Sequence, residues 1–347
     1  MNYTISSIVV TGSAVLSAAG VGVTPIVSLM RSGKNAFSAM PFDVLNADGH
    51  LWGKNTGFKA SDFMPPMKAR KMDRCSQFAV SAVGLALKDA GIDVKEIAPD
   101  RVGIVLGSGF CGVSNSAEFL TGYFKEGVEG MIPMIFPNTV PNAPASNASI
   151  EHGFKGPNAT MVQRFCSAES AFLMACRFIE EGRADVVITG GTDELMPLMI
   201  KGFSAMGQIK HNSPPYGEGC GVLILESSAH AARRSARVKA RFTGLSTIGM
   251  FAPGCEETGL DLLLNGSDEC SHVSLSGVAS DLPLLVQRVS GKKVIDTGSA
   301  IGRSLAMGGT ALAVLVDVLE PGQSGLHLAA SPQGPYYALR CSGGPSV

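Results

Sequence analysis

The sequence predicts an α/β fold in which strands and helices alternate along most of the chain. Continuous apolar runs rich in β-branched residues recur between stretches whose apolar residues repeat at helical spacing. Strands of that continuous kind are typical of sheets that helices cover on both faces. The 42 glycines are scattered among these runs without a repeat, which indicates many tight connections between strands and helices. With 347 residues and an apolar fraction of 45%, the chain suits one large domain or two fused halves.

These patterns predict the elements in chain order. Continuous apolar runs predict strands over residues 8–11, 101–106, 184–189, 221–226 and 294–296. Helical spacing predicts helices over residues 24–31, 76–90, 167–181, 229–237 and 307–319. Gly91 directly follows one of these helices and is a suitable C-terminal stop. The periodicity fades over residues 250–291, and we place the division between two halves near Ser227, at residues 1–227 and 228–347.

The charge balance argues against nucleic acids and anionic membranes as partners. Lys and Arg number 28 against 29 Asp and Glu, so the net charge is −1 and no positive excess is available to bind phosphates. Charged residues make up 16% of the chain, less than the roughly 25% of ordinary soluble proteins, which suits an obligate oligomer. The 8 cysteines form no C-x-x-C pair, and no apolar stretch approaches the roughly 20 residues of a membrane span. We therefore expect a reduced, cytoplasmic protein without a membrane span.

Cys166 is the candidate nucleophile because it directly precedes a predicted helix. In the segment Q-R-F-C-S-A-E-S, its thiol would lie at the positive end of the helix dipole, next to unpaired backbone N–H groups. Both features lower the pKa of a thiol and favour the reactive thiolate. The residues before Cys166 fit the end of a strand, so this residue would occupy a strained turn between strand and helix. On the local pattern alone, the commoner state of a free cysteine, a small buried hydrophobe, is favoured.

Five longer segments extend this local pattern to most of the first 240 residues. They are IVVTGSAVLSAAG, MDRCSQFAVSAVGLALKDAGI, RVGIVLGSG, GFKGPNATMVQRFCSAESAFLMACRFIEEGRADVVITGGTDE and GEGCGVLILESSAHAARRSAR. In these segments, and again near residues 294–320, the chain resembles the β-ketoacyl synthase (ketosynthase) family of thiolase-like condensing enzymes. The segments follow one another in the family's order, and Cys166 stands at the family's nucleophile position.

This resemblance implies a thiolase-like αβαβα layered fold of two similar halves, of which the second is shortened. It also implies pairing across a twofold axis, with acyl tunnels near the interface. The substrates would be acyl groups on the phosphopantetheine arm of an acyl carrier protein. Beyond that arm, no cofactor is expected.

The chain departs from the family at its two auxiliary histidines, which assist decarboxylation of the malonyl extender and stabilise the enolate oxygen. The family's first histidine lies in H-G-T-G-T; the nearest stretch here is S-L-S-G-V-A-S-D, with Ser276 in the histidine's place. The segment D-T-G-S-A-I-G-R-S-L-A-M-G-G carries Arg303 in place of the second. The guanidinium stays charged and cannot shuttle protons as a histidine does. The family's glycine-rich closing loop is replaced by S-P-Q-G-P-Y-Y at residues 331–337. A slipped alignment would instead bring in His272, one of 6 histidines, none of which has zinc-ligand spacing, so no metal is expected.

Two further features suit a chain that does not elongate. Phe110 follows the G-S-G turn, where the family has a smaller residue facing the acyl pocket; ordinary core packing explains this phenylalanine as well. The segment M-I-P-M-I-F-P corresponds to the family stretch that crosses the dimer interface, so that Met134, Ile135 and Phe136 would help to set where the growing chain stops. Simple interface packing is the alternative for these three.

The resemblance therefore predicts a non-elongating ketosynthase homologue that forms a heterodimer with an active ketosynthase. Such a subunit is similar to the chain-length factor of type II polyketide and fatty-acid-type synthesis, and within that group to the partner subunits of aryl-polyene systems. The alternative is an active acyltransferase or atypical condensing enzyme, in which Cys166 accepts the acyl group, since thiol acylation needs only a thiolate and an oxyanion hole. A scaffold without either role is the third interpretation. Whether the chain is an enzyme is thus left open.

Overall fold

The computed structural model describes residues 2–3, 5, 7–45, 49–209 and 214–345. The strands of this part are β1 (Asn2–Tyr3), β2 (Ile8–Ser17), β3 (Gly20–Val21), β4 (Ser38–Ala39), β5 (Leu51–Trp52), β6 (Val102–Ser108), β7 (Asn158–Met161), β8 (Val186–Asp193), β9 (Gly219–Ser227), β10 (Ala240–Ile248), β11 (His272–Gly277), β12 (Lys293–Asp296), β13 (Ser324–Ala330) and β14 (Tyr336–Gly343). The helices are α1 (Thr24–Arg31), α2 (Phe42–Leu45), α3 (Pro66–Ala69), α4 (Arg74–Asp89), α5 (Val113–Glu126), α6 (Ala143–His152), α7 (Ser167–Glu180), α8 (Pro197–Ala205), α9 (Ser228–Arg233), α10 (Glu256–Leu264), α11 (Pro283–Arg288), α12 (Thr297–Ile301) and α13 (Gly308–Val318). Each predicted strand and helix has a counterpart among them.

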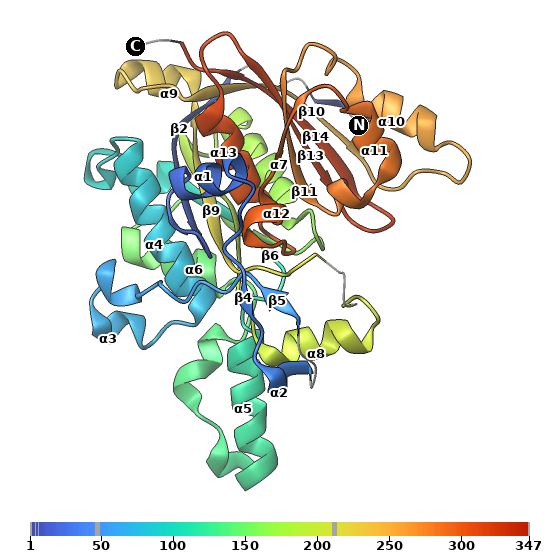
Figure 1. Cartoon of the computed structure of the whole chain (residues 1–347). Helices are drawn as coiled ribbons and strands as arrows, with labels where there is room; N and C mark the ends of the chain where they lie inside the picture. The colour runs from blue at the N-terminus through green and yellow to red at the C-terminus, as the bar shows by residue number, and fades with distance from the viewer. Residues whose placement is uncertain (1, 4, 6, 46–48, 210–213, 346–347) are drawn as a thin grey trace.

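One topology occurs twice in the large mixed sheet, whose main path runs β12-β11-β13-β14-β10-β2-β9-β8-β6-β7 (Figure 1). From its outer edge inward, the first half reads β7-β6-β8-β9-β2, and the second half reads β12-β11-β13-β14-β10 in the same relative order. The halves join where Val9 and Val10 of β2 pair with Arg241 and Ala240 of β10. The last strand of the first half ends at Ser227, and the domain division predicted at this residue stays a prediction.

The described part of the chain has three hydrophobic cores, one central and two outer. The alternation along β9 shows the principle, because Leu223 and Leu225 join the central core while Val222 and Ile224 join the core beneath α4 and α6. The helices α7 and α13 contribute to the central core. The outer core of the second half contains Leu263 of α10, together with residues of α11, β11 and β13. The predicted layered α/β fold is therefore confirmed.

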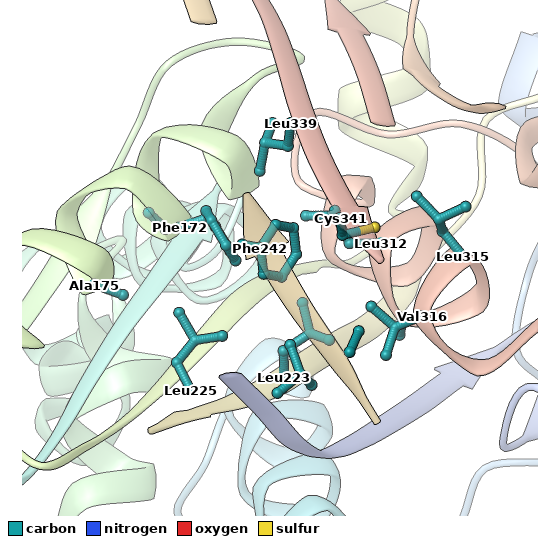
Figure 2. Packing of buried hydrophobic residues seen from close by; sticks show 14 of the residues in the cluster. Phe172, Ala175, Leu223, Leu225, Phe242, Leu312, Leu315, Val316, Leu339 and Cys341 are labelled. Carbon is teal, nitrogen blue, oxygen red and sulfur yellow. The ribbon is translucent and has the colours of Figure 1, made fainter. Parts of the chain in front are cut away.

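The central core joins the two halves through aromatic packing (Figure 2). Phe172 comes from α7 and Phe242 from β10, and their ring centroids lie 4.4 Å apart at an interplanar angle of 57°. Both side chains are buried. Tilted aromatic pairs at this separation add to the free energy gained from burial, so the halves are held as one packed body.

Candidate functional site

Cys166 lies in a tight turn between β7 and α7, directly before the first residue of the helix. Its backbone N–H donates to the carbonyl of Gln163 at 3.1 Å, and the Ser167 hydroxyl donates to the carbonyl of Arg164 at 2.7 Å. Arg164 has a φ of 50°, in the left-handed region that non-glycine residues seldom adopt. The strain predicted for this turn is thus present, and it falls on Arg164.

The thiol of Cys166 is fully buried beneath the loop between β13 and β14. Its Sγ donates to the carbonyl oxygen of Pro335 at 3.3 Å, and the Ser331 hydroxyl donates to the sulfur at 3.7 Å. Burial raises the pKa of the Cys166 thiol well above its ordinary value, and the nearby Glu169 raises it further. The expectation that the helix terminus lowers this pKa is therefore wrong, because desolvation disfavours the thiolate more than the hydrogen bond from Ser331 favours it.

Ser276 and Arg303 lie on the wall of one cavity of about 300 Å³. Ser276 belongs to the end of β11, and Arg303 follows α12. The Arg303 guanidinium forms an ion pair with Asp281 and lies 5.8 Å from the ring centroid of Tyr216. Other described residues of the wall are Pro214, Pro215, Leu275, Gly277, Ser280, Asp296, Thr297, Gly298, Ser299, Gly302, Ser304 and Met307. The structure therefore brings together the two positions at which histidines were expected and not found, and none of these wall residues is a histidine.

Residues of two cores form the wall of this cavity, because Leu275 belongs to the outer core and Met307 to the central core that also contains Cys166. Phe165 packs in the outer core with Leu275, whereas Cys166 packs in the central core. Phe165 also lies against the cavity wall, because a Cβ built on Gly277 would be 2.9 Å from the Phe165 Cβ. Cys166 itself is absent from the described residues that line the cavity.

His272 does not replace the histidine that Ser276 lacks. It begins β11, whereas Ser276 lies near the other end of this strand, and it lines a separate surface cavity with Arg31 and Lys293. The slipped alignment is therefore not supported. His211 lies outside the described residues. Among the described residues no group of three His, Cys, Asp or Glu side chains could hold a metal ion.

The sequence analysis missed one polar cluster beside Cys166. Nε2 of His327 lies 2.8 Å from Oε1 of Glu169, and its Nδ1 lies 2.6 Å from the Ser274 hydroxyl. All three side chains are fully buried. A glutamate within the apolar run S-A-E-S-A-F-L-M-A and a histidine within S-G-L-H-L-A-A were the available signals, because buried charged groups need partners.

The residues predicted to form a tunnel or interface precede and follow α5. Phe110 is partly buried, with its ring at 5.2 Å and 89° from Phe203 in the outer core, a contact that is compatible with its predicted pocket role and with core packing. Met134 and Phe136 belong to the 3₁₀ segment Pro133–Asn138 and are 61% and 59% exposed. Ile135 between them is partly exposed. Their predicted role stays a prediction.

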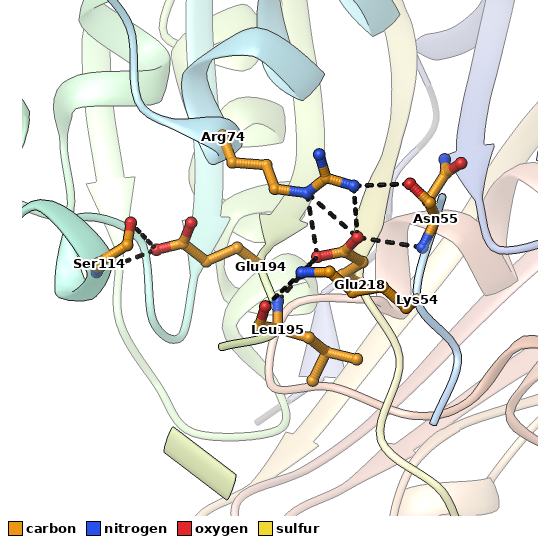
Figure 3. A network of polar contacts seen from close by, with 7 residues as sticks. All are labelled: Lys54, Asn55, Arg74, Ser114, Glu194, Leu195 and Glu218. Atoms are coloured by element: carbon orange, nitrogen blue, oxygen red, sulfur yellow. Dashed lines mark hydrogen bonds and ion pairs between the residues drawn. The ribbon is translucent and has the colours of Figure 1, made fainter. Parts of the chain in front are cut away.

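The buried carboxylate of Glu218 holds several segments of the first half together (Figure 3). Glu218 receives hydrogen bonds from Lys54 Nζ at 2.9 Å, from Arg74 Nη2 at 2.5 Å and from the backbone N–H of Leu195 at 2.9 Å. Burial raises the pKa of Glu218, but the hydrogen bond and charge of Arg74 with the charge of Lys54 outweigh it, so the pKa lies below its ordinary value. This carboxylate ties α4 to β9 and to the segments after β5 and β8.

Glu194, which follows β8, holds the beginning of α5. Its Oε1 accepts hydrogen bonds from the Ser114 hydroxyl at 2.6 Å and the Ser114 backbone N–H at 3.2 Å, as Figure 3 shows. Burial raises the pKa of Glu194 to about 7, although the Ser114 hydrogen bond opposes the shift. The carboxylate at the helix N-terminus satisfies backbone donors that the helix itself leaves unpaired.

Comparison with known proteins agrees with this geometry. The family model described as "Beta-ketoacyl synthase, N-terminal domain" matches residues 6–231. A 3-oxoacyl-[acyl-carrier-protein] synthase 2 of Staphylococcus aureus (strain COL) is 30% identical over 259 residues, which cover 70% of this chain and 63% of that protein. The enzyme of the same name from Vibrio cholerae is 29% identical over 260 residues, with the same two coverages. The chain thus aligns with 63% of the length of these two curated relatives.

Solved structures share the whole fold. The ishigamide ketosynthase/chain length factor has a TM-score of 0.79 and 19% identity, and a Beta-ketoacyl synthase from Burkholderia phymatum STM815 has a TM-score of 0.84 and 20% identity. A type II PKS acyl-carrier protein in complex with its ketosynthase contains a chain with a TM-score of 0.79 and 22% identity. Each match covers 97% of this chain and 99% of the other. The repeated topology and the cysteine before α7 define a thiolase-like protein. More particularly, the chain belongs to the beta-ketoacyl synthase family.

A search for membrane-spanning segments gives one further result. None of the helices in the described ranges combines the length and the apolar character that crossing a bilayer requires.

Proposed function

We propose that this chain is a non-elongating member of the family that pairs with an active ketosynthase and acts as a chain-length-factor-like subunit. The observation that carries the proposal is the cavity that holds Ser276 and Arg303 where an elongating enzyme uses two histidines. Cys166 lies outside the described lining of that cavity and beneath the loop at residues 331–335. The histidines that decarboxylative elongation needs are therefore replaced, and the thiol is not among the residues described on the cavity wall.

The chemistry of the cavity supports the same conclusion. Elongation needs donors that strengthen as the enolate oxygen gains charge, and groups that exchange protons near neutral pH. Arg303 exchanges no proton in this range, and its guanidinium is held by Asp281. Ser276 offers only a neutral hydroxyl. Neither side chain can take over the acid–base work of a histidine.

The exposed surface of α5 and the segment after it supports pairing with another subunit. The structure shows no buried residue on α5, and this helix projects away from the sheet in Figure 1. Large apolar side chains are exposed along it and the following segment, namely Leu120, Tyr123, Phe124, Val128, Ile132, Met134, Phe136 and Val140. Contiguous apolar surface of this kind is typical of protein interfaces. The edge strand β7 is followed by Val162, which is 59% exposed. An open strand edge is itself a surface for pairing.

We further propose that the paired protein works on acyl groups carried by an acyl carrier protein, in polyketide or fatty-acid-type synthesis, with aryl-polyene synthesis as the narrower candidate. The carrier-protein complex among the similar structures supports this partner class. The chain itself would contribute no cofactor chemistry. Its part would be the shape of the acyl tunnel at the interface.

Co-expression with the ketosynthase encoded beside it tests the proposal. After purification, both subunits are incubated with acyl- and malonyl-carrier protein, and the intact mass of each is recorded. We expect a stable heterodimer in which only the ketosynthase is acylated. A homodimer acylated on this chain, with the adduct lost in Cys166→Ala, would overturn the proposal in favour of the alternative acyltransferase function.

A substitution at Phe136 tests the tunnel role within that heterodimer. We expect Phe136→Ala to lengthen the products by at least one extension unit, because the truncated side chain leaves space where the growing chain would stop. Product lengths are measured by mass spectrometry of carrier-protein adducts. Leu262→Ala is the matched control, since Leu262 on α10 is 58% exposed against 59% for Phe136. Weaker pairing with unchanged product length would assign Phe136 to interface packing alone.

A further inference from the structure

Glu169 is a buried carboxylate between the beginnings of two helices. It lies in the first turn of α7, which Cys166 precedes. It also touches the first residue of α13, because a Cβ built on Gly308 would be 1.9 Å from Oε1 of Glu169. Only glycine leaves room for the carboxylate at that position. Helix N-termini carry partial positive charge, which favours a negative group placed against them.

The remaining contacts of Glu169 come from the second half of the chain. Its Oε1 lies 2.8 Å from Nε2 of His327 on β13, and Nδ1 of that histidine lies 2.6 Å from the Ser274 hydroxyl on β11. Its Oε2 has no hydrogen-bond partner among the described residues. The side chain is fully buried, so water does not screen its charge from its neighbours as it would at the surface.

We propose that Glu169 is a positioning residue that keeps Cys166 in its neutral thiol form. A thiolate at Cys166 would be stabilised by the partial positive charge at the start of α7. The Glu169 carboxylate, one turn along this helix, already interacts with that charge. A second negative charge in the same buried region is disfavoured by repulsion from the first. The inference concerns the isolated chain, so it stands or fails separately from the proposed pairing with a ketosynthase.

The hydrogen bonds of Cys166 fit a neutral thiol. Its S–H group has an acceptor in the Pro335 carbonyl at 3.3 Å, an oxygen that would repel a thiolate at the same place. The other titratable groups that face the sulfur are the phenols of Tyr336 and Tyr337 on β14, whose pKa values burial raises. They carry no charge near neutral pH. Burial is the larger cause of the raised pKa of Cys166, and the charge of Glu169 adds to it.

The pH dependence of Cys166 alkylation tests the inference. Full-length protein is treated with iodoacetamide at a series of pH values, and modification of the Cys166 peptide is followed by mass spectrometry. We expect Glu169→Gln to move the midpoint of the profile to lower pH. At a fixed pH below the midpoint, the reaction becomes roughly tenfold faster, the change that one pKa unit produces. An unchanged midpoint in folded Glu169→Gln would overturn the proposal.

Two variants separate this charge effect from loosened packing. His327→Gln disturbs the same cluster without removing the negative charge, so its midpoint should stay or rise; a fall equal to that of Glu169→Gln would contradict the inference. Ser331→Ala opens the covering loop and should change the rate at every pH without lowering the midpoint. If Glu169→Gln does not fold, Glu169→Met at the same site must show the lowered midpoint, and failure to do so overturns the proposal equally.

Discussion

Replacing Glu218 by alanine is expected to cost about 3 kcal/mol of unfolding free energy, the lower end of the range for breaking a buried ion pair, because the two cations it leaves without a counterion are only partly buried. The Glu218 carboxylate is fully buried and receives Lys54 at 2.9 Å and Arg74 at 2.5 Å. In the variant, Arg74 keeps the Asn55 carbonyl at 2.6 Å but loses its charge partner. Denaturant titration of the purified variant measures the loss.

The same carboxylate sets a pH dependence. Since the pKa of Glu218 in the folded protein lies below its ordinary value, its contribution is fully present above the pKa of the unfolded chain. That contribution is lost as the pH falls through the folded-state pKa. Glu151→Ala is the control, because the Lys68–Glu151 pair is solvent-exposed and exposed pairs contribute at most about 1 kcal/mol. Equal losses in the two variants would contradict a special role for the buried network.

Replacing Phe172 by alanine is expected to destabilise the protein by about 3–5 kcal/mol, the usual cost of removing a buried aromatic side chain. Phe172 is fully buried, and its ring lies 4.4 Å from that of Phe242. Because α7 and β10 belong to different halves, we expect one cooperative unfolding transition in both wild type and variant. Calorimetry and fluorescence, recorded on the same samples, measure this.

Phe124→Ala on α5 provides the comparison for the core substitution. Phe124 is 79% exposed, so its removal from the isolated chain should change stability by less than about 0.5 kcal/mol. Two separate transitions in Phe172→Ala would show that the halves unfold independently, contrary to the continuous packing of the central core.

The elements that the sequence predicted are those with strong periodicity or many buried residues. The helix predicted over 24–31 is α1 with the same bounds, although Ile26 is its one buried residue, and 10 of the residues of α7 are buried. Two groups among the missed elements show what the sequence pattern lacks. The region 250–291 contains α10, β11 and α11, of 9, 6 and 6 residues, which are too short for a clear period. The missed helix α5 has no buried residue in the isolated chain, so its apolar side chains do not mark a core face.

The position of Cys166 before a helix could be predicted from the sequence, but the pKa of its thiol could not. The place of Cys166 before a helix follows from neighbouring residues. The state of its thiol depends on Pro335 and Ser331, which lie more than a hundred residues away in the sequence and reach it only in the folded chain. The local helix terminus argued for a lower pKa, and burial by these distant segments reversed the sign. A local sequence pattern cannot show burial by segments that are distant in the sequence, and this burial sets the pKa here.

The pairing of β2 has a consequence for synthesis on the ribosome. Residues 8–17 are synthesised well before their long partner β9, which begins only at Gly219, and β10 comes later still. At about 5–20 residues per second, roughly 10–40 seconds pass before β9 emerges, and until then β2 has only the short strand β3, which pairs with Leu16 and Ser17. During this interval the nascent chain carries an apolar strand that is unpaired along most of its length, which is an aggregation hazard. Early handling by a chaperone would then matter more for the yield of this protein than its final stability.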